Sequence, residues 1–241
     1  TTLATAAGFV TLMTVTLILA RFPLGGRFLG GCFHLNLGGV GAEQTGDGLE
    51  QLAKQTRFGG DRERADAVYS DPPWGEGNVR YWRTHAGQDP APHRWVTFRD
   101  AWVFGVSKVL GPGAPLFVEM GERWAVDFCA AFAQRGIHLA RRWTTHYRAG
   151  SKLLPCALLY AGPALPEDFD PSGLRGAALP QACLPAVRPH LRDDAIVLDP
   201  CCGKGFTARA ALALGLRFRG VELNGDRAAV TEALLCREPR P

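Results

Sequence analysis

Apolar and polar positions along the chain alternate between two patterns, short apolar runs and longer stretches with helical spacing. The short runs end at turn residues or at a carboxylate and predict buried strands at 65–70, 115–120, 195–198 and 218–222. Two further strands, 137–147 and 156–160, flank a basic turn. Helical spacing predicts helices at about 96–110, 123–134, 181–191 and 206–214, and one more after residue 222. Strands that alternate with helices predict an α/β fold with a mostly parallel sheet covered on both faces.

Three stretches interrupt this alternation. Residues 75–94 are polar and rich in Gly, Pro, Arg and His, and they predict an exposed loop. Residues 162–178 form a linker rich in Pro and Gly, and the glycine-rich stretch 24–48 has no readable pattern.

The N-terminal segment contains an uncharged apolar run from Phe9 to Ala20, followed by Arg21. Its length is compatible with a short membrane span or a signal region. No basic segment precedes the run, however, and β-branched residues dominate its centre. The pattern therefore favours a buried strand or hairpin over a membrane segment.

Composition narrows the class of protein only slightly. The chain has 241 residues, 46% of them hydrophobic, which suits one large α/β domain. A net charge of +4 suits a polyanionic partner, although many ordinary domains carry such a charge. The seven cysteines are irregularly spaced without a Cys-x-x-Cys pair, which favours reduced, mostly buried thiols over disulfides or a zinc site. This usage indicates a cytoplasmic protein without a metal centre.

A glycine turn, Asp199-Pro-Cys-Cys-Gly-Lys-Gly205, follows the strand at 195–198. Its glycines let the backbone approach a ligand, and Glu222 ends the next strand, where a carboxylate accepts hydrogen bonds from a ribose diol. A phosphate-binding P-loop is excluded, because position 198 is Leu and no Ser or Thr follows Lys204. A dinucleotide site matches Gly-x-Gly-x-x-Ala, but the residues after Glu222 are too few for its second half. The turn also suits the adenosyl-binding site of a methyltransferase, with Asp199 near the sulfonium. The remaining alternative is a glycine turn that holds no ligand.

The strand at 65–70 ends at Asp71-Pro72-Pro73-Trp74. An exocyclic base amine is a poor nucleophile because its lone pair is delocalised into the ring, and acceptors for both amino hydrogens would aim that lone pair at a methyl group. Asp71 supplies one acceptor, and the Pro72 carbonyl, fixed by the prolines, supplies the other. Trp74 offers a face on which a flipped-out base can stack. The alternative is that these residues are only a turn.

Together the two motifs resemble those of the permuted, beta-class DNA amino-methyltransferases, which modify adenine N6 or cytosine N4 and in which the catalytic motif precedes the cofactor glycines. The resemblance covers about residues 45–235, and Gly46-Asp47 resembles the loop that contacts the cofactor adenine. It implies a Rossmann-like fold with a seven-stranded sheet in one domain, 45–241, after a segment 1–44 of unassigned role packed on the core. It also implies that S-adenosylmethionine is bound by Asp47, Asp199, Pro200, Cys201, Gly203, Gly205, Phe206, Glu222 and Asn224. Cys201 departs from the family, which usually has an aromatic residue there, and the Lys-Pro motif expected before the cofactor strand is not evident.

The resemblance also bears on the substrate. Cytosine enzymes of this family more often carry Ser in place of Asp71, so Asp implies adenine, in DNA first and in RNA second. Residues 75–95 and 162–178 are the small recognition loops that the chain has room for. Basic and aromatic side chains suit phosphate contact and base stacking. The predicted nucleic-acid-binding residues are Arg80, Tyr81, Trp82, Arg83, His85, Arg94, Arg148 and Lys152. The basic run 141–148, which includes Arg148, fits a solvent-exposed hairpin that contacts no ligand equally well.

The leading hypothesis is a DNA adenine N6-methyltransferase that acts on a flipped-out base, associated with the nucleoid in a prokaryote or virus. The competing hypotheses are an RNA adenine or DNA cytosine N4 enzyme, a non-catalytic methyltransferase-like subunit that binds nucleic acid, and a nicotinamide-dependent oxidoreductase. The small recognition loops predict that a homodimer or a partner subunit completes the contact with DNA, with no membrane involved.

Overall fold

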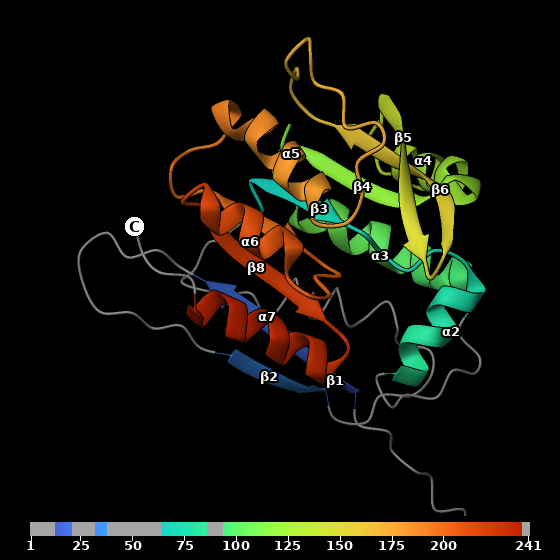
Figure 1. Ribbon diagram of the computed structural model, residues 1–241, viewed down its shortest axis with the longest axis vertical. Helices are drawn as coiled ribbons and strands as arrows, with labels where there is room; N and C mark the ends of the chain where they lie inside the picture. The colour runs from blue at the N-terminus through green and yellow to red at the C-terminus, as the bar shows by residue number, and fades with distance from the viewer. Residues whose placement is uncertain (1–12, 21–31, 38–63, 86–93, 238–241) are drawn as a thin grey trace, which may run out of the picture.

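The described part of the chain is built around one sheet (Figure 1). The computed structural model describes residues 13–20, 32–37, 64–85 and 94–237. In these residues eight strands pair in the order β2-β1-β8-β7-β3-β4-β6-β5. The strands are β1 (Met13–Ala20), β2 (Cys32–Leu37), β3 (Ala67–Ser70), β4 (Leu116–Gly121), β5 (Arg141–Ala149), β6 (Lys152–Ala161), β7 (Ile196–Asp199) and β8 (Arg217–Glu222).

The strand directions correct the prediction of a seven-stranded, mostly parallel sheet. Three of the seven neighbouring pairs are parallel, and they join the central strands β8, β7, β3 and β4. The other four pairs, at the two sides of the sheet, are antiparallel. A hairpin forces its two strands to be antiparallel neighbours. Two pairs of strands consecutive in the chain, β1–β2 and β5–β6, are antiparallel neighbours of this kind. Strands β5 and β6 correspond to the two strands predicted around the basic turn, whereas β2 and the antiparallel pairing of β1 with β8 and of β6 with β4 are not predicted.

Helices cover both faces of this sheet (Figure 1). They are α2 (Glu76–His85), α3 (Trp95–Val109), α4 (Ala125–Ala133), α5 (Ala178–Val187), α6 (Phe206–Ala213) and α7 (Gly225–Arg237), with single 3-10 turns η1 (Glu122–Trp124) and η2 (Arg188–His190). Helices α5, α6 and α7 lie on one face, and α3 and α4 lie on the other. The predicted two-faced α/β layering is confirmed.

Two hydrophobic cores result, because successive side chains of a strand point to opposite faces. Tyr69 and Phe117 pack in the core beneath α5 and α6. Val68 and Val118 pack in the other core, with Phe128 of α4. Strands buried on both faces need apolar residues at every position, which explains the continuous apolar runs in the sequence.

Helix α2 corrects the prediction of an exposed loop at 75–94. Residues 76–85 contain no proline, and Glu76 lies in the first turn, where a negative charge stabilises a helix. Val79 is buried against the α3–α4 core, and Trp82 follows one turn later. The prolines of the stretch fall at 86–93, outside the described residues, and they make the whole stretch resemble a loop in the sequence.

The linker at 162–178 is confirmed as free of helix and strand up to residue 177. It is nevertheless attached to the sheet, because the Leu174 carbonyl accepts a hydrogen bond from the His146 amide and Leu165 is buried in the core. At the N-terminus, the predicted strand matches β1, which extends the sheet beyond β8, whereas β2 lies in the glycine-rich stretch for which the sequence gives no prediction. Within the described residues no helix has the length and apolarity to cross a bilayer.

Candidate functional site

The site lies at the edge of the sheet where the central strands end. Parallel strands bring their carboxyl ends to one edge, and ligands of open α/β sheets bind there. Asp71 follows β3, Asp199 ends β7 and Glu222 ends β8. The three carboxylates line one cavity of about 450 Å³. Residues far apart in the chain thus meet because their strands are neighbours in the sheet.

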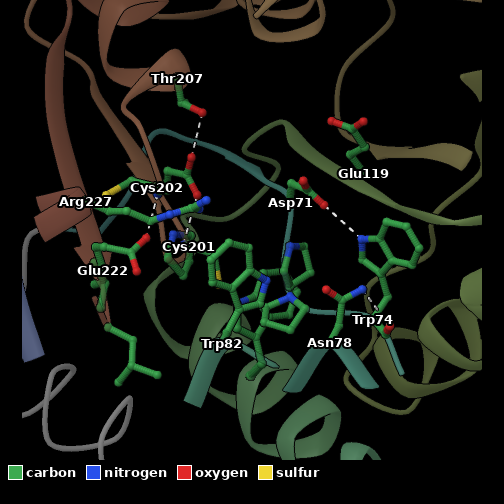
Figure 2. A pocket seen from close by; sticks show the side chains of 18 of the residues that line it. Asp71, Trp74, Asn78, Trp82, Glu119, Cys201, Cys202, Thr207, Glu222 and Arg227 are labelled. Atoms are coloured by element: carbon green, nitrogen blue, oxygen red, sulfur yellow. Dashed lines mark hydrogen bonds between the residues drawn. The ribbon is translucent and has the colours of Figure 1, made fainter. Parts of the chain in front are cut away.

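The cavity has two halves (Figure 2). Glu222 and Arg227 lie on one side, Trp74 and Glu119 lie on the other, and Asp71 lies between them. Trp82 and Asn78 of α2 line a further wall, so the helix that replaces the predicted loop is part of the site. Asn78 and Trp82 are four residues apart, a spacing that puts both on one helix face.

The Asp71-Pro-Pro-Trp74 turn is fixed by helices on its outer side. The Pro73 carbonyl accepts a hydrogen bond from Trp95 Nε1 of α3 at 3.3 Å. The Trp74 carbonyl accepts one from Asn78 Nδ2 of α2 at 3.2 Å. Because the prolines restrict the backbone and these contacts anchor it, the side chain of Asp71 starts from a rigid position.

Trp74 holds the carboxylate of Asp71. Its indole Nε1 donates a hydrogen bond to Asp71 Oδ1 at 3.1 Å. One part of the ring lies directly against Gly121, where a Cβ would be 2.5 Å from Trp74 Cε3. Tyr147 meets the ring edge-on with a centroid separation of 5.9 Å. Trp74 is therefore packed in place by the sheet, and only part of the ring is left for the base stacking that the sequence suggested.

The surroundings of Asp71 raise its pKa to about 7. The side chain is open to the cavity, but the protein around it displaces most water from the carboxyl, and this desolvation is the main cause. The negative charge of Asp199 adds to the rise, whereas the Trp74 hydrogen bond and the charge of Arg227 oppose it. Asp71 is thus poised to gain or lose a proton near neutral pH.

We expect Trp74→Phe to raise the pKa of Asp71 further. Phenylalanine keeps an aromatic ring against Gly121 but removes the N–H that stabilises the charged carboxylate. An NMR titration of the carboxyl carbons in aspartate-labelled protein measures this pKa. Tyr147→Leu is the control, because it removes the edge contact and leaves the N–H in place. An unchanged or lowered Asp71 pKa in Trp74→Phe contradicts the assignment.

Glu222 joins the glycine turn to the loop after β8. Its Oε2 accepts a hydrogen bond from the Gly203 amide at 2.8 Å, and its Oε1 accepts one from the Asn224 amide at 2.8 Å. Gly205 has a φ of +76°, and a Cβ there would be 2.8 Å from Thr231 of α7. The turn thus requires glycine at this position both for its backbone conformation and for its packing.

Asp199 organises the start of the same turn. It is buried, and its Oδ1 accepts hydrogen bonds from Ser70 Oγ at 2.8 Å and from the Cys201 amide at 3.0 Å. Its Oδ2 accepts one from Thr207 Oγ1 at 2.6 Å. Burial raises the pKa of Asp199 to about 6, and these three hydrogen bonds limit the rise. Its oxygens are therefore engaged within the protein, and its charge acts on the cavity through space.

The structure brings together most of the residues predicted from the motifs. Those that line the cavity are Asp71, Pro72, Pro73, Trp74, Asp199, Pro200, Cys201, Gly203, Phe206 and Glu222. Gly205 and Asn224 flank the lining through the turn contacts described above, and Asp47 lies outside the described residues. Beside Cys201, where the resemblance implies an aromatic residue, Trp102 of α3 supplies an aromatic side chain to the cavity wall.

The predicted nucleic-acid residues separate into two groups. Trp82 and Arg83 line the cavity. The guanidinium of Arg227 lies 3.8 Å from the centre of the Trp82 ring, so one face of this ring is covered. The others lie outside the lining, on α2, before α3 and at the end of the β5–β6 hairpin: Arg80, Tyr81, His85, Arg94, Arg148 and Lys152.

Sequence reasoning missed Glu119, Asn78 and Arg227 as lining residues. Glu119 does leave a signal, because it is the single carboxylate within the apolar strand Leu116–Gly121. Asn78 is missed because its helix is predicted to be a loop. Arg227 leaves no signal, since it follows the cofactor-like segment in an ordinary helix start.

The sequence matches no protein-family model and no curated protein. Solved structures do match the fold. M1.HpyAVI is 16% identical, with a TM-score of 0.54 over 78% of this chain and 93% of its own. The DNA modification methylase TTHA0409 from Thermus thermophilus is 18% identical, with a TM-score of 0.56 over 79% and 92%.

A third match is PvuII DNA methyltransferase, a cytosine-N4-specific enzyme, at 14% identity with a TM-score of 0.55 over 74% of this chain and 82% of its own. The chain shares the fold of these three proteins. At these identities the similarity concerns the fold of these DNA methyltransferases. M1.HpyAVI and TTHA0409 have both also been solved in complex with S-adenosylmethionine. The predicted α/β fold is thereby confirmed, as the fold that this chain shares with these proteins.

Proposed function

We propose that this protein transfers a methyl group from S-adenosylmethionine to the N6 amino group of adenine in DNA. The observation that carries the proposal is the shared cavity in which Asp71 and Glu222 face the same space. A catalytic carboxylate and a ribose-binding carboxylate must open to the same cavity if one bound cofactor and one base are to contact them together. The methyltransferase fold supports the proposal, since solved structures with this fold include S-adenosylmethionine complexes.

The Glu222 half of the cavity suits the cofactor. Each Glu222 oxygen accepts one hydrogen bond from a backbone amide and keeps a lone pair that can accept another from a ribose hydroxyl. Gly203, with a φ of +52°, lets the backbone approach the ligand closely. Bound S-adenosylmethionine supplies a methyl group on a positively charged sulfur. The nearby charges of Asp71 and Asp199 favour a cation at this place.

Asp71 acts on the substrate amine. Its Oδ1 is held by Trp74, and its second oxygen accepts a hydrogen bond from one amino hydrogen, with the Pro72 carbonyl as the acceptor for the other. The nitrogen lone pair then forms the new N–C bond as the C–S bond breaks, and the sulfur keeps that electron pair. The methylated nitrogen loses one proton, and a carboxylate with a pKa near 7 accepts it and releases it to solvent.

Adenine in DNA is the preferred substrate because Asp71, in place of Ser, implies adenine within the family that the motifs resemble. Cytosine N4 is the second candidate, and the fold similarity to a cytosine-N4-specific enzyme favours it. Both bases present an exocyclic amine next to a ring nitrogen, so the same two acceptors serve either reaction. We further propose that a second copy or a partner subunit completes recognition, since α2 and the β5–β6 hairpin are small contact elements.

The function is tested with S-adenosylmethionine carrying a labelled methyl group and separate pools of DNA and RNA. The proposal predicts label in the DNA pool, dependent on Asp71. Label in RNA alone moves the substrate to RNA. Binding of nucleic acid without label in either pool, with cofactor bound, identifies a non-catalytic subunit instead.

We expect Arg80→Ala to weaken DNA binding and to spare cofactor binding. Arg80 is exposed on α2 and does not line the cavity. Loss of one phosphate contact reduces the slope of log affinity against log salt by about 1. Fluorescence anisotropy over a salt series measures the slope, and calorimetry measures cofactor affinity. Arg135→Ala, at the opposite edge of the sheet, is the control. Equal losses of DNA and cofactor affinity in Arg80→Ala would sink the assignment.

A further inference from the structure

Glu119 is a buried carboxyl group for which the proposed reaction has no use so far. It lies within β4 and is only 6% exposed, yet it lines the cavity on the Trp74 side (Figure 2). The hydroxyl of Tyr69 donates a hydrogen bond to Glu119 Oε2 at 3.1 Å. A carboxyl group placed in an apolar strand costs free energy unless its interactions compensate, so its position requires an explanation.

The surroundings of Glu119 favour its neutral form. Burial raises its pKa well above the ordinary value, and the charges of Asp71 and Asp199 raise it further, whereas the Tyr69 hydrogen bond opposes the rise. The titratable groups near it are Tyr69 from β3, Asp71 directly after β3, Asp199 from β7, Cys156 from β6 and Cys183 from α5. None of these is a cation that would stabilise a charged Glu119.

A neutral Glu119 presents a hydrogen-bond donor to the cavity. Tyr69 donates to Oε2, and among the described residues Oε1 has no hydrogen-bond partner. The proton of the acid therefore belongs on Oε1. Asp71, in contrast, presents an acceptor oxygen to the same space. The wall of the cavity thus offers an acceptor and a donor, from neighbouring strands β3 and β4.

We propose that Glu119 reads the substrate base by donating a hydrogen bond to the ring nitrogen next to the methylated amine. This inference rests on the proposed function and deepens it. Adenine N1 and cytosine N3 are acceptors beside an amino group, so they match the acceptor–donor pair of Asp71 and Glu119. Guanine has an N1–H beside its amino group and would set two donors against each other. The pair therefore selects adenine or cytosine over guanine.

The test uses a DNA oligonucleotide whose target adenine is replaced by 1-deazaadenine, which has C–H in place of N1. For the wild-type protein we expect kcat/KM to fall about tenfold to hundredfold, as for a buried donor left without its acceptor. For Glu119→Leu we expect a similar fall on ordinary adenine and no further fall on the analogue. Glu119→Gln keeps an N–H donor of similar size, and we expect it to restore discrimination between the two bases. If the methylated base is cytosine, 3-deazacytosine takes the place of 1-deazaadenine.

Calorimetry of S-adenosylmethionine binding to each variant shows whether the cofactor half of the site is folded. Equal sensitivity to the deaza base in wild type and Glu119→Leu overturns the role of Glu119 and leaves the methyltransferase function standing. A wild-type protein that methylates guanine, or no base at all, overturns both.

Discussion

Asp71→Ala lowers the rate of methyl transfer about 100- to 1000-fold, the loss expected when a preorganised group aimed at the transition state is removed. The carboxylate aligns the amine and takes its proton, and neither role passes to another side chain of the turn. Glu222 and the glycine turn are untouched, so the variant still binds S-adenosylmethionine, with an affinity lowered only by the loss of one nearby negative charge. Single-turnover kinetics measures the rate, and calorimetry measures the affinity.

The pH dependence separates the two roles of Asp71. Its pKa in the free protein is raised to about 7, and the deprotonated form accepts the amino hydrogen, so the wild-type kcat/KM increases as the pH rises through about 7 and then levels off. Asp71→Asn has no titration, so we expect no step near pH 7, and its single carbonyl oxygen serves only one of Trp74 Nε1 and the substrate amine, so kcat/KM stays well below the wild-type value. A wild-type rate that falls as the pH rises through 7 contradicts the requirement for a charged carboxylate.

Glu222→Ala weakens S-adenosylmethionine binding about 100-fold, since two hydrogen bonds from the ribose to a charged group are lost at roughly 1.5 kcal/mol each. The same substitution leaves the amides of Gly203 and Asn224 without their acceptor, which loosens the turn that frames the ligand. Calorimetry measures the dissociation constant.

Glu222→Gln is the matched control for that loss. Its single carbonyl oxygen serves one of the two amides, so we expect an intermediate affinity. S-adenosylhomocysteine, which shares the ribose and lacks the positive charge, should lose affinity in parallel with S-adenosylmethionine. A dissociation constant for Glu222→Ala within about twofold of wild type, with a folded protein by circular dichroism, places the ribose elsewhere. The twofold threshold corresponds to less than about half a kilocalorie.

The parts of the site that depend on the ends of buried strands are predictable from the sequence. Asp71, Asp199 and Glu222 each follow an apolar run, and parallel strands carry such residues to one edge. The glycines of the turn are also predictable from the local sequence, because the positive φ of Gly203 and Gly205 disfavours any other residue. These features are set within a few residues of the chain.

The rest of the site depends on contacts between distant segments, which local patterns do not encode. No local pattern places Trp74 against Gly121, because that contact forms only when the turn folds over β4. The sequence does not predict helix α2, because the neighbouring prolines at 90 and 92 obscure its Asn78–Trp82 spacing. The sequence predicts the two strands of the β5–β6 hairpin, but it does not predict that β6 pairs antiparallel with β4 or β1 with β8, because pairing between strands distant in the chain depends on topology.

The acidic wall of the cavity gives the site its chemical character. Three carboxyl groups, from Asp71, Glu119 and Asp199, share one desolvated space. The charge of Asp199 raises the pKa of both other groups, and the charge of Asp71 raises that of Glu119. A site of this kind binds a cationic ligand well and loses affinity for it as its acids become protonated. We infer that the positive charge of the cofactor is part of what stabilises the charged form of Asp71 in the working complex.

The most direct test of the proposed methyl transfer is mass spectrometry of nucleosides from DNA methylated by the purified protein. We expect N6-methyladenine in DNA treated with the wild-type protein and at least about a 100-fold smaller yield with Asp71→Ala, because a transition-state contact is lost. N4-methylcytosine in place of N6-methyladenine contradicts the assignment of the base. The absence of any methylated nucleoside, from a protein that binds S-adenosylmethionine, contradicts the assignment of catalysis to this cavity.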